Sequence, residues 1–166
     1  MVYNDFKEIL PQKEPFMFID GVKEFNKNTS ILIAYKRFTP DEYFFKGHFP
    51  GEPLVPGVIL IEALSQSCIL CGSYSTRDNT NNDSHFEHLM YEIKVKFRNK
   101  CYPNKDILLY AKMIDVLQNV STFKVRATDT DNNTIASGEI RGIAKEKRVV
   151  PRTHSNCRLQ NLHHHG

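Results

Sequence analysis

Residues 57–72 constrain the fold more than any other part of the sequence. As a helix, this stretch is apolar on nearly every side, and the larger polar side chains that interrupt it are Glu62 and Gln66. A helix that is hydrophobic all round has to be covered on all sides. At about 1.5 Å per residue it would be roughly 24 Å long, which is short for a membrane span. We therefore predict the buried core helix of a soluble fold, with no membrane span.

Strands that can cover this helix are predicted before and after it in the chain. In the first stretch after the helix, apolar and polar residues alternate with the period of two that is typical of a half-buried strand. The predicted strands are residues 16–25, 30–38, 89–98, 107–117, 122–128 and 134–144. One helix with an antiparallel sheet of about six strands is an α+β fold. Because one curved sheet does not enclose a helix easily, we expect a second subunit to complete the cover.

The length of 166 residues suits a single domain, which we expect to span residues 1–144. It should begin with a short helix over residues 4–10 and contain a mobile polar stretch at residues 77–85. Aspartate and asparagines at residues 129–133 are typical of a hairpin turn. Residues 145–166 lack periodicity and are expected to form a flexible basic tail.

The charge of the chain lies mostly in that tail. The formal net charge is +3, and the tail holds five basic residues against one acidic residue, so the domain itself is near neutral. A nucleic-acid-binding protein usually presents a clustered basic face, and the overall charge gives no support for one. We read the tail as a solvated terminus that could also touch an acidic partner weakly.

The four cysteines do not form a recognisable metal or disulfide pattern. Cys68 and Cys71 have C-x-x-C spacing, but no second pair or suitably spaced histidine follows them. We read both as small hydrophobes on the core helix, in preference to a metal or redox site. The first ten residues carry Asp5, Lys7 and Glu8 and have no apolar segment that would make a signal peptide. Reduced thiols without an export signal indicate the cytoplasm, and we do not expect the histidines at 163–165 to bind a metal.

The residues around the start of the helix are the one group in the sequence whose side chains and backbone together suggest a reaction. His48 lies in a loop stiffened by three prolines, of which Pro56 opens the helix. The free N–H groups at a helix start attract negative charge, and Glu62 is a carboxyl group in apolar surroundings. His48 could remove a proton next to a carbonyl, the N–H groups of Gly57 and Val58 could stabilise the enolate, and Glu62 could protonate a leaving hydroxyl. Each residue alone is more often structural, but together they favour an elimination of water.

The segment closely resembles the signature of the (3R)-hydroxyacyl-acyl carrier protein dehydratases, G-H-F-P-G-x-P-x-x-P-G followed by an apolar E-A-L-x-Q helix. The matching residues are Gly47, His48, Phe49, Pro50, Gly51, Pro53, Pro56, Gly57, Glu62, Ala63, Leu64 and Gln66. The segment from Ile9 to Asp20 also looks like the family's N-terminal motif, and the segment from Lys94 to Pro103 looks like a later strand and turn. The resemblance covers about residues 6–144.

This resemblance implies a hotdog fold, in which an antiparallel sheet wraps around the central helix. It implies a homodimer, in the family often a trimer of dimers, with His48 of one subunit facing Glu62 of the other. Phe49, Pro56 and Gln66 would then surround the catalytic pair, and backbone amides at Gly57 and Val58 would bind the thioester carbonyl. The substrate would be a 3-hydroxyacyl thioester on the phosphopantetheine of acyl carrier protein, dehydrated to the trans-2-enoyl thioester without a metal or dissociable cofactor. Glu62 in place of aspartate favours this branch of the family over the one that also isomerises the double bond.

The chain departs from the family pattern at several positions. Gln12 stands where the family usually has histidine, which puts the packing of the active-site entrance in doubt. The stretch around residues 79–83 looks longer than usual, and the turn at residues 104–106 differs. These departures suggest a divergent member with a specialised acyl chain. An acyl thioesterase on the same fold and a catalytically weak acyl-binding scaffold subunit are the competing interpretations.

A row of basic residues offers a candidate docking surface for acidic acyl carrier protein. The four residues are Lys94, Lys96, Arg98 and Lys100, which share one face of their predicted strand. A solvated outer face of the sheet explains them equally well, because antiparallel sheets commonly expose one polar face.

Overall fold

The structure, a computed structural model, describes residues 3–76 and 86–146. Six strands form one antiparallel sheet in the order β1-β2-β4-β5-β6-β3. Their bounds are β1 Gly21–Asn26, β2 Ile31–Arg37, β3 Phe86–Phe97, β4 Asp106–Leu117, β5 Val120–Thr128 and β6 Thr134–Glu146. The α+β prediction with about six antiparallel strands is therefore confirmed. The strand that follows the helix, β3, forms one edge of the sheet.

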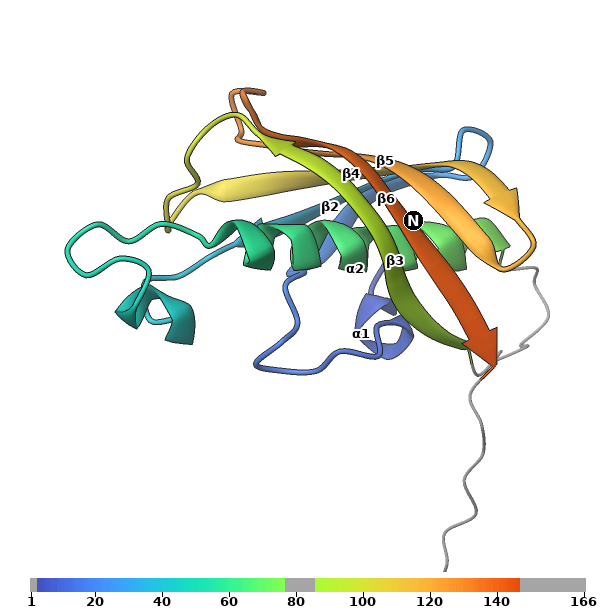
Figure 1. The fold of residues 1–166 in the computed structure, drawn as a ribbon, viewed down its shortest axis with the longest axis horizontal. Helices are drawn as coiled ribbons and strands as arrows, with labels where there is room; N and C mark the ends of the chain where they lie inside the picture. Colours follow the sequence, from blue (N-terminus) through green and yellow to red (C-terminus); the bar gives the residue numbers. More distant parts are fainter. Residues whose placement is uncertain (1–2, 77–85, 147–166) are drawn as a thin grey trace, which may run out of the picture.

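The long helix α2, Gly57–Thr76, lies along the inner side of the curved sheet, and β3 crosses in front of it (Figure 1). It packs against β2, β3, β4 and β5. Leu60, Leu64, Leu70 and Cys71 of α2 are fully or almost fully buried. The prediction of a central buried helix is confirmed.

The helix is one turn longer than predicted, because it continues past Gly72 to Thr76. Tyr74 accounts for this extension: its ring packs on Tyr3 and Phe25, and its hydroxyl donates a hydrogen bond to Asp5 Oδ1 at 2.7 Å. Twenty residues make a helix of about 30 Å, which is long enough to cross a membrane. The argument that the helix is too short for a membrane span is therefore wrong. Its burial distinguishes it from a membrane span, since 61% of its most apolar 18-residue window lies inside the protein.

The strand predicted at residues 16–25 begins only at Gly21. The side chain of Gln66 on α2 explains the late start. Gln66 Nε2 donates to the carbonyl of Phe16 at 2.9 Å, and the N–H of Phe18 donates to Gln66 Oε1 at 2.8 Å. The backbone before Gly21 is thus bound to the helix, and the first bond toward β2 runs from Asp20 N–H to the Tyr35 carbonyl.

The other predicted elements differ from the structure mainly at their ends. The N-terminal helix is a single turn, α1 Phe6–Ile9, and the loop before α2 contains a short 3-10 helix, η1 Tyr43–Lys46. The hairpin turn at residues 129–133 is confirmed by the hydrogen bond from Asp129 N–H to the Asn133 carbonyl at 3.1 Å. The mobile stretch predicted at 77–85 lies outside the described residues, as do Cys157, His163–His165 and most of the predicted tail.

Candidate active site

The loop that carries His48 is tied to the fold at several points. The N–H of His48 donates to the Phe44 carbonyl in η1 at 3.1 Å, and the N–H of Leu54 donates to the His48 carbonyl at 3.1 Å. One residue further, Val55 N–H donates to the Cys101 carbonyl at 2.9 Å. The tip turns at Gly51, whose φ of +83° is accessible to glycine without strain. These bonds, together with the prolines, hold the histidine in a defined position.

The His48 side chain is half-buried and held by two contacts. Its Nδ1 lies 3.0 Å from the carbonyl oxygen of Leu54, and its ring stacks on Phe49 with a centroid distance of 4.0 Å. A carbonyl oxygen can only accept, so Nδ1 carries the hydrogen when the ring is neutral. The lone pair of the neutral imidazole is then on Nε2, which is the arrangement that a general base needs.

Glu62 lies on α2, one helical turn after the helix start, and is also half-buried. Its Oε1 accepts two hydrogen bonds, from Gln66 Nε2 at 2.9 Å and from Gln12 Nε2 at 3.2 Å. Gln66 is fully buried and also binds the backbone of Phe16 and Phe18. The carboxyl group is therefore oriented by two amide side chains, one from its own helix and one from the N-terminal segment.

The start of α2 lies between His48 and Glu62 in the sequence, and it provides backbone N–H donors. Ile59 and Leu60 both donate to the Pro56 carbonyl, at 3.0 and 3.1 Å. The N–H groups of Gly57 and Val58 come before them, where a helix leaves its first N–H groups without an internal partner. Val58 is 72% exposed. A Cβ atom at position 57 would lie 2.9 Å from the Phe97 ring, so the ring covers this end of the helix only because residue 57 is glycine.

A family model of the FabA-like domain matches residues 10–139. The chain belongs to the FabA-like domain family. The matched region contains His48, Glu62 and every strand except the end of β6.

Several solved structures are similar to this chain in fold. The dehydratase heterocomplex ApeI:P from Xenorhabdus doucetiae contains a chain that matches with a TM-score of 0.71 and 12% identity, covering 86% of this chain and 91% of that one. A hypothetical thioesterase with coenzyme A from Streptococcus pneumoniae TIGR4 matches with a TM-score of 0.54 and 7% identity, covering 76% and 86%. A mutant of the fluoroacetyl-CoA thioesterase FlK with fluoroacetate matches with a TM-score of 0.57 and 13% identity, covering 70% and 86%. At these identities the matches establish the shared hotdog fold.

Within this FabA-like chain, the predicted site residues form two groups. Glu62 and Gln66 bind each other on α2, while His48 contacts Leu54 and Phe49 in the loop. Along the chain, the helix start at Pro56, Gly57 and Val58 lies between His48 and Glu62. No hydrogen bond links His48 to Glu62 within the described part of this single chain, so their direct pairing stays a prediction.

The four basic residues of the candidate docking surface are all exposed. Lys94 and Lys96 lie on β3, and Arg98 and Lys100 follow it. Lys94 forms an ion pair with Glu92 at 2.9 Å, and Lys100 forms one with Glu52 at 2.8 Å. Carboxylates thus neutralise part of this surface, and its docking role stays a prediction.

The sequence placed Gln12 at the active-site entrance, but it did not predict that Gln12 binds Glu62. It is the departure from the family pattern, and the structure places its amide directly on the Glu62 carboxyl group. Glutamine in a loop has no periodicity that would place it beside a helix fifty residues later. The signal that could have found it is its position in the N-terminal motif, where the family usually has another polar side chain.

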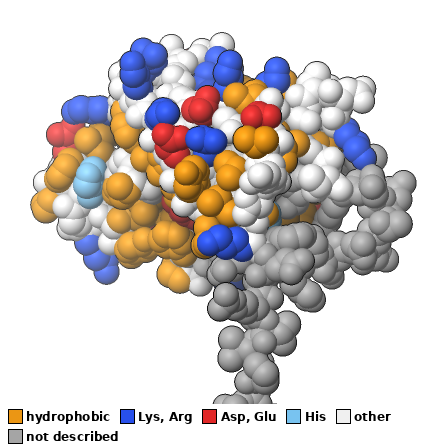
Figure 2. All heavy atoms as spheres, turned by 45° about the vertical axis from the view of Figure 1, so that its right-hand side comes forward, with side chains coloured by type: hydrophobic (Ala, Val, Ile, Leu, Met, Phe, Trp, Pro, Cys, Tyr) orange, Lys and Arg blue, Asp and Glu red, His pale blue; other side chains and the backbone are white. Residues whose placement is uncertain are grey.

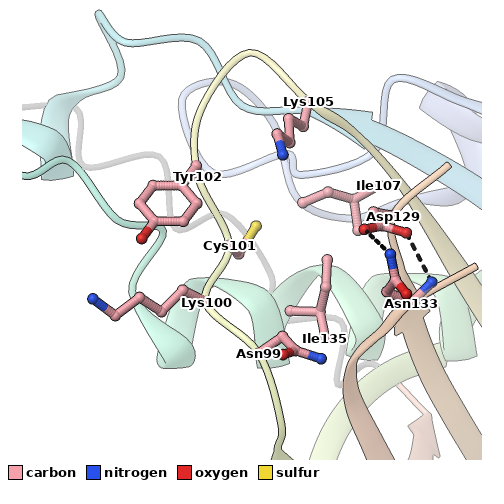
Figure 3. A pocket seen from close by; sticks show the side chains of 9 residues that line it. All are labelled: Asn99, Lys100, Cys101, Tyr102, Lys105, Ile107, Asp129, Asn133 and Ile135. Atoms are coloured by element: carbon pink, nitrogen blue, oxygen red, sulfur yellow. Dashed lines mark hydrogen bonds between the residues drawn. The ribbon is translucent and has the colours of Figure 1, made fainter. Parts of the chain in front are cut away.

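A separate cavity of about 230 Å³ lies between the segment after β3 and the turn from β5 to β6 (Figure 3). Its lining residues are Asn99, Lys100, Cys101, Tyr102, Lys105, Ile107, Asp129, Asn133 and Ile135. Burial raises the pKa of the Cys101 thiol to about 12, so this thiol is unreactive. Asp129 is occupied by the Asn133 side chain at 2.9 Å. None of the residues in the His48 and Glu62 groups lines this cavity.

The two cysteines of the C-x-x-C pair behave as small hydrophobes. Cys68 and Cys71 are buried and free on α2, and burial raises the pKa of both thiols. Across the described ranges 3–76 and 86–146, no group of three or more histidine, cysteine or acidic side chains is placed to hold a metal ion.

Proposed function

We propose that this chain is a hydro-lyase that dehydrates 3-hydroxyacyl thioesters carried on acyl carrier protein to trans-2-enoyl thioesters. The observation that carries the proposal is the hydrogen bond between His48 Nδ1 and the Leu54 carbonyl at 3.0 Å. It leaves Nε2 as the basic nitrogen in a loop next to the start of a helix. The signature residues around His48 and Glu62 support the same reaction.

The proposed reaction begins when His48 Nε2 removes a proton from C2 of the thioester, and the electron pair moves onto the carbonyl oxygen. The N–H groups of Gly57 and Val58 donate to this enolate oxygen. The electron pair then returns to form the C2–C3 double bond while the C3–O bond breaks. Glu62 gives its proton to the departing oxygen, and water leaves. A protonated His48 and an ionised Glu62 result, and proton exchange through solvent restores both.

The proposed active unit is a homodimer, with the option of a trimer of dimers. β3 is an edge strand with one free side, and five of its apolar side chains are exposed. They are Leu89, Met90, Tyr91, Ile93 and Phe97. Hydrophobic side chains also lie open on the face shown in Figure 2. A second copy that covers this edge would bring its own His48 and Glu62, and would explain why the two groups are not joined within one chain.

The proposed partner is acyl carrier protein, docked on Lys94, Lys96, Arg98 and Lys100, and the proposed chemistry takes place in the cytoplasm. It uses no metal and no dissociable cofactor, because the acid, the base and the oxyanion donors all come from the chain itself.

Thioester hydrolysis is the second candidate function. The structures that share the fold include a hypothetical thioesterase and the fluoroacetyl-CoA thioesterase FlK. Hydrolysis would require His48 or Glu62 to activate a water molecule toward the thioester carbonyl. The complete proline-rich loop of the dehydratase signature favours the elimination.

The test is a turnover assay with 3-hydroxybutyryl- and longer 3-hydroxyacyl-acyl carrier proteins, in which enoyl formation and free thiol are measured in the same sample. His48→Ala and Glu62→Gln should each lower enoyl formation roughly 100- to 10,000-fold, the usual contribution of a general acid or base. Glu62→Gln keeps a carbonyl oxygen for the Gln12 and Gln66 amides, so the fold around it should persist.

Glu14→Gln is the matched control, because Glu14 is exposed and lies in the segment that borders the site. It should leave the rate unchanged. Release of thiol that depends on His48 would establish the thioesterase instead. Binding of acyl carrier protein without either product would favour a scaffold subunit.

A further inference from the structure

The cavity between the segment after β3 and the turn from β5 to β6 is lined by two opposite charges, Lys105 and Asp129 (Figure 3). Hydrogen bonds from Asn133 lower the pKa of the Asp129 carboxyl group, and the nearby Lys105 ammonium group lowers it further. The two charges are therefore close enough to interact. Within the described chain, however, no ion pair joins them, and Lys105 has no other ion pair. An unpaired ammonium group and a carboxylate thus border the same space.

The carboxylate of Asp129 can accept one more hydrogen bond. Its Oδ1 accepts from the backbone N–H groups of Asp131 and Asn133, at 3.0 and 2.8 Å. Its Oδ2 accepts one bond in the described chain, from Asn133 Nδ2 at 2.9 Å. A carboxylate oxygen has two lone pairs, so Oδ2 keeps one for a further donor. Asn99 adds an acceptor to the lining, because its Nδ2 donates to the Thr134 carbonyl at 2.7 Å and its Oδ1 stays available.

The other lining residues define the size and the polarity of a ligand. Lys100 is already paired, since its Nζ binds Glu52 Oε1 at 2.8 Å. Cys101 and Ile135 are almost fully buried and give the cavity an apolar floor. The volume of about 230 Å³ greatly exceeds the roughly 10–15 Å³ that a single water molecule needs. The cavity can therefore hold a small organic molecule that carries one anionic group, one cationic group and a short apolar part.

We propose that this cavity binds a small zwitterionic amino acid, whose carboxylate pairs with Lys105 and whose ammonium group donates to Asp129 and Asn99. A molecule with the carboxylate alone would be repelled by Asp129, and a molecule with the amine alone would be repelled by Lys105. A zwitterion matches both charges at once. Its aliphatic side chain would lie on the apolar floor.

The position of the cavity makes this amino acid an effector and not a substrate. None of the residues in the His48 and Glu62 groups lines the cavity. The segment after β3 nevertheless anchors the loop of His48, because the Cys101 carbonyl accepts from the N–H of Val55 at 2.9 Å. A ligand in the cavity contacts this segment and is placed to act on the loop through it. The inference does not depend on the proposed dehydratase function.

The test is an NMR titration of the full chain, in which the backbone amide signals of Cys101, Lys105 and Asp129 report binding. L-leucine is compared with isoamylamine, which lacks the carboxylate, and with isocaproate, which lacks the ammonium group. Leucine should bind roughly 5- to 10-fold more tightly than either analogue. This factor lies between the value of an exposed ion pair and that of a hydrogen bond to a charged group.

Two variants assign each charge of the ligand to its partner. Lys105→Met should bring leucine and isoamylamine to equal affinity, and Asp129→Asn should bring leucine and isocaproate to equal affinity. Lys112→Met is the matched control, because Lys112 is an exposed lysine on β4 that does not line the cavity. This variant should keep both preferences. Thermal melting verifies folding, and if Asp129→Asn loosens the turn, the exposed Lys105 still provides the decisive variant.

Leucine that shifts none of the three amide signals would overturn the proposal. Equal affinities of leucine and isocaproate in the native protein would show a site for anions alone. Equal affinities of leucine and isoamylamine would show a site for cations alone, and either result would overturn the proposal. A preference for leucine over isoamylamine that survives Lys105→Met would place the carboxylate elsewhere and overturn it too. Because binding is read without any turnover, these outcomes are independent of the dehydration assay.

Discussion

A single glutamine side chain, Gln66, connects three parts of the site. It is fully buried, binds Glu62, and pairs with the carbonyl of Phe16 and the N–H of Phe18. Each buried backbone group that loses its partner costs about 1–3 kcal/mol. Gln66→Leu should therefore lower the free energy of unfolding by roughly 2–4 kcal/mol, measured by urea denaturation, and should also lower dehydration. Gln12→Met removes only one donor and should cost less than half as much. Equal losses in the two variants would contradict this account.

At the residue level, the sequence identified the proposed catalytic side chains better than it identified the groups that hold them in place. His48 and Glu62 were identifiable because their types and spacing match a long motif. Two of the groups that contact them, Phe49 and Gln66, belong to the same motif. The other two were not predicted, because Leu54 acts through its backbone carbonyl and Gln12 through a tertiary contact across fifty residues. Neither kind of contact leaves a pattern in a single sequence.

The start of α2 depends on the fit between Gly57 and the ring of Phe97 on β3. A Cβ atom on residue 57 would lie 2.9 Å from this ring, too close for carbon atoms. Gly57→Ala should destabilise the protein by about 1–3 kcal/mol through overpacking. In a Phe97→Leu background the same change should be neutral or stabilising, because alanine favours helix over glycine by about 1 kcal/mol. A double-mutant cycle on unfolding free energies measures this coupling. Equal effects of Gly57→Ala in both backgrounds would rule the contact out.

The β3–β6 pair carries a pH-sensitive residue outside the site. His88 lies opposite Ala144, and burial lowers the pKa of its imidazole below the ordinary value. In the unfolded chain the same group takes up a proton near pH 6.5. The unfolded state therefore binds more protons, and the stability that is present above pH 6.5 is lost as the pH falls below it. His88→Gln should show a smaller drop in melting temperature between pH 7.5 and 5.5 than the native protein. Identical drops would show that His88 does not contribute.

Element types were predictable from periodicity, whereas element ends were set by tertiary contacts. The alternation on β3 and the apolar helix gave the correct fold class. The first strand starts late because Gln66 takes over its backbone bonds, and α2 runs one turn further because Tyr74 packs on Tyr3 and Phe25. These contacts join residues about fifty to seventy positions apart, so local sequence does not reveal them.

At the scale of the whole molecule, the sheet of one chain has an open edge at β3, and we propose that the site is completed by a second copy. The free edge of β3 exposes Leu89, Tyr91, Ile93 and Phe97, each between 39% and 59% accessible. A sheet edge with exposed apolar residues is a natural place for another chain to pair. Among the described residues, His48 and Glu62 of one chain are not joined by a hydrogen bond, since each binds other partners. The proposed second copy, packed across β3, would complete both the sheet and the site.

This association should be sensitive to a charge placed on β3. Ile93→Lys should convert the protein from a dimer, or a multiple of it, to a monomer in light-scattering chromatography, because a buried lysine without a partner is costly. Dehydration should fall with it, since neither subunit would retain a partner's catalytic residue. Val116→Lys is the matched control: it places the same charge on an apolar residue that is 52% exposed but lies on β4. This variant should keep both the assembly and the activity. A native protein that is monomeric at assay concentrations and still dehydrates its substrate would show that the site is complete within one chain, and His48 and Glu62 would then have to approach each other in the same subunit.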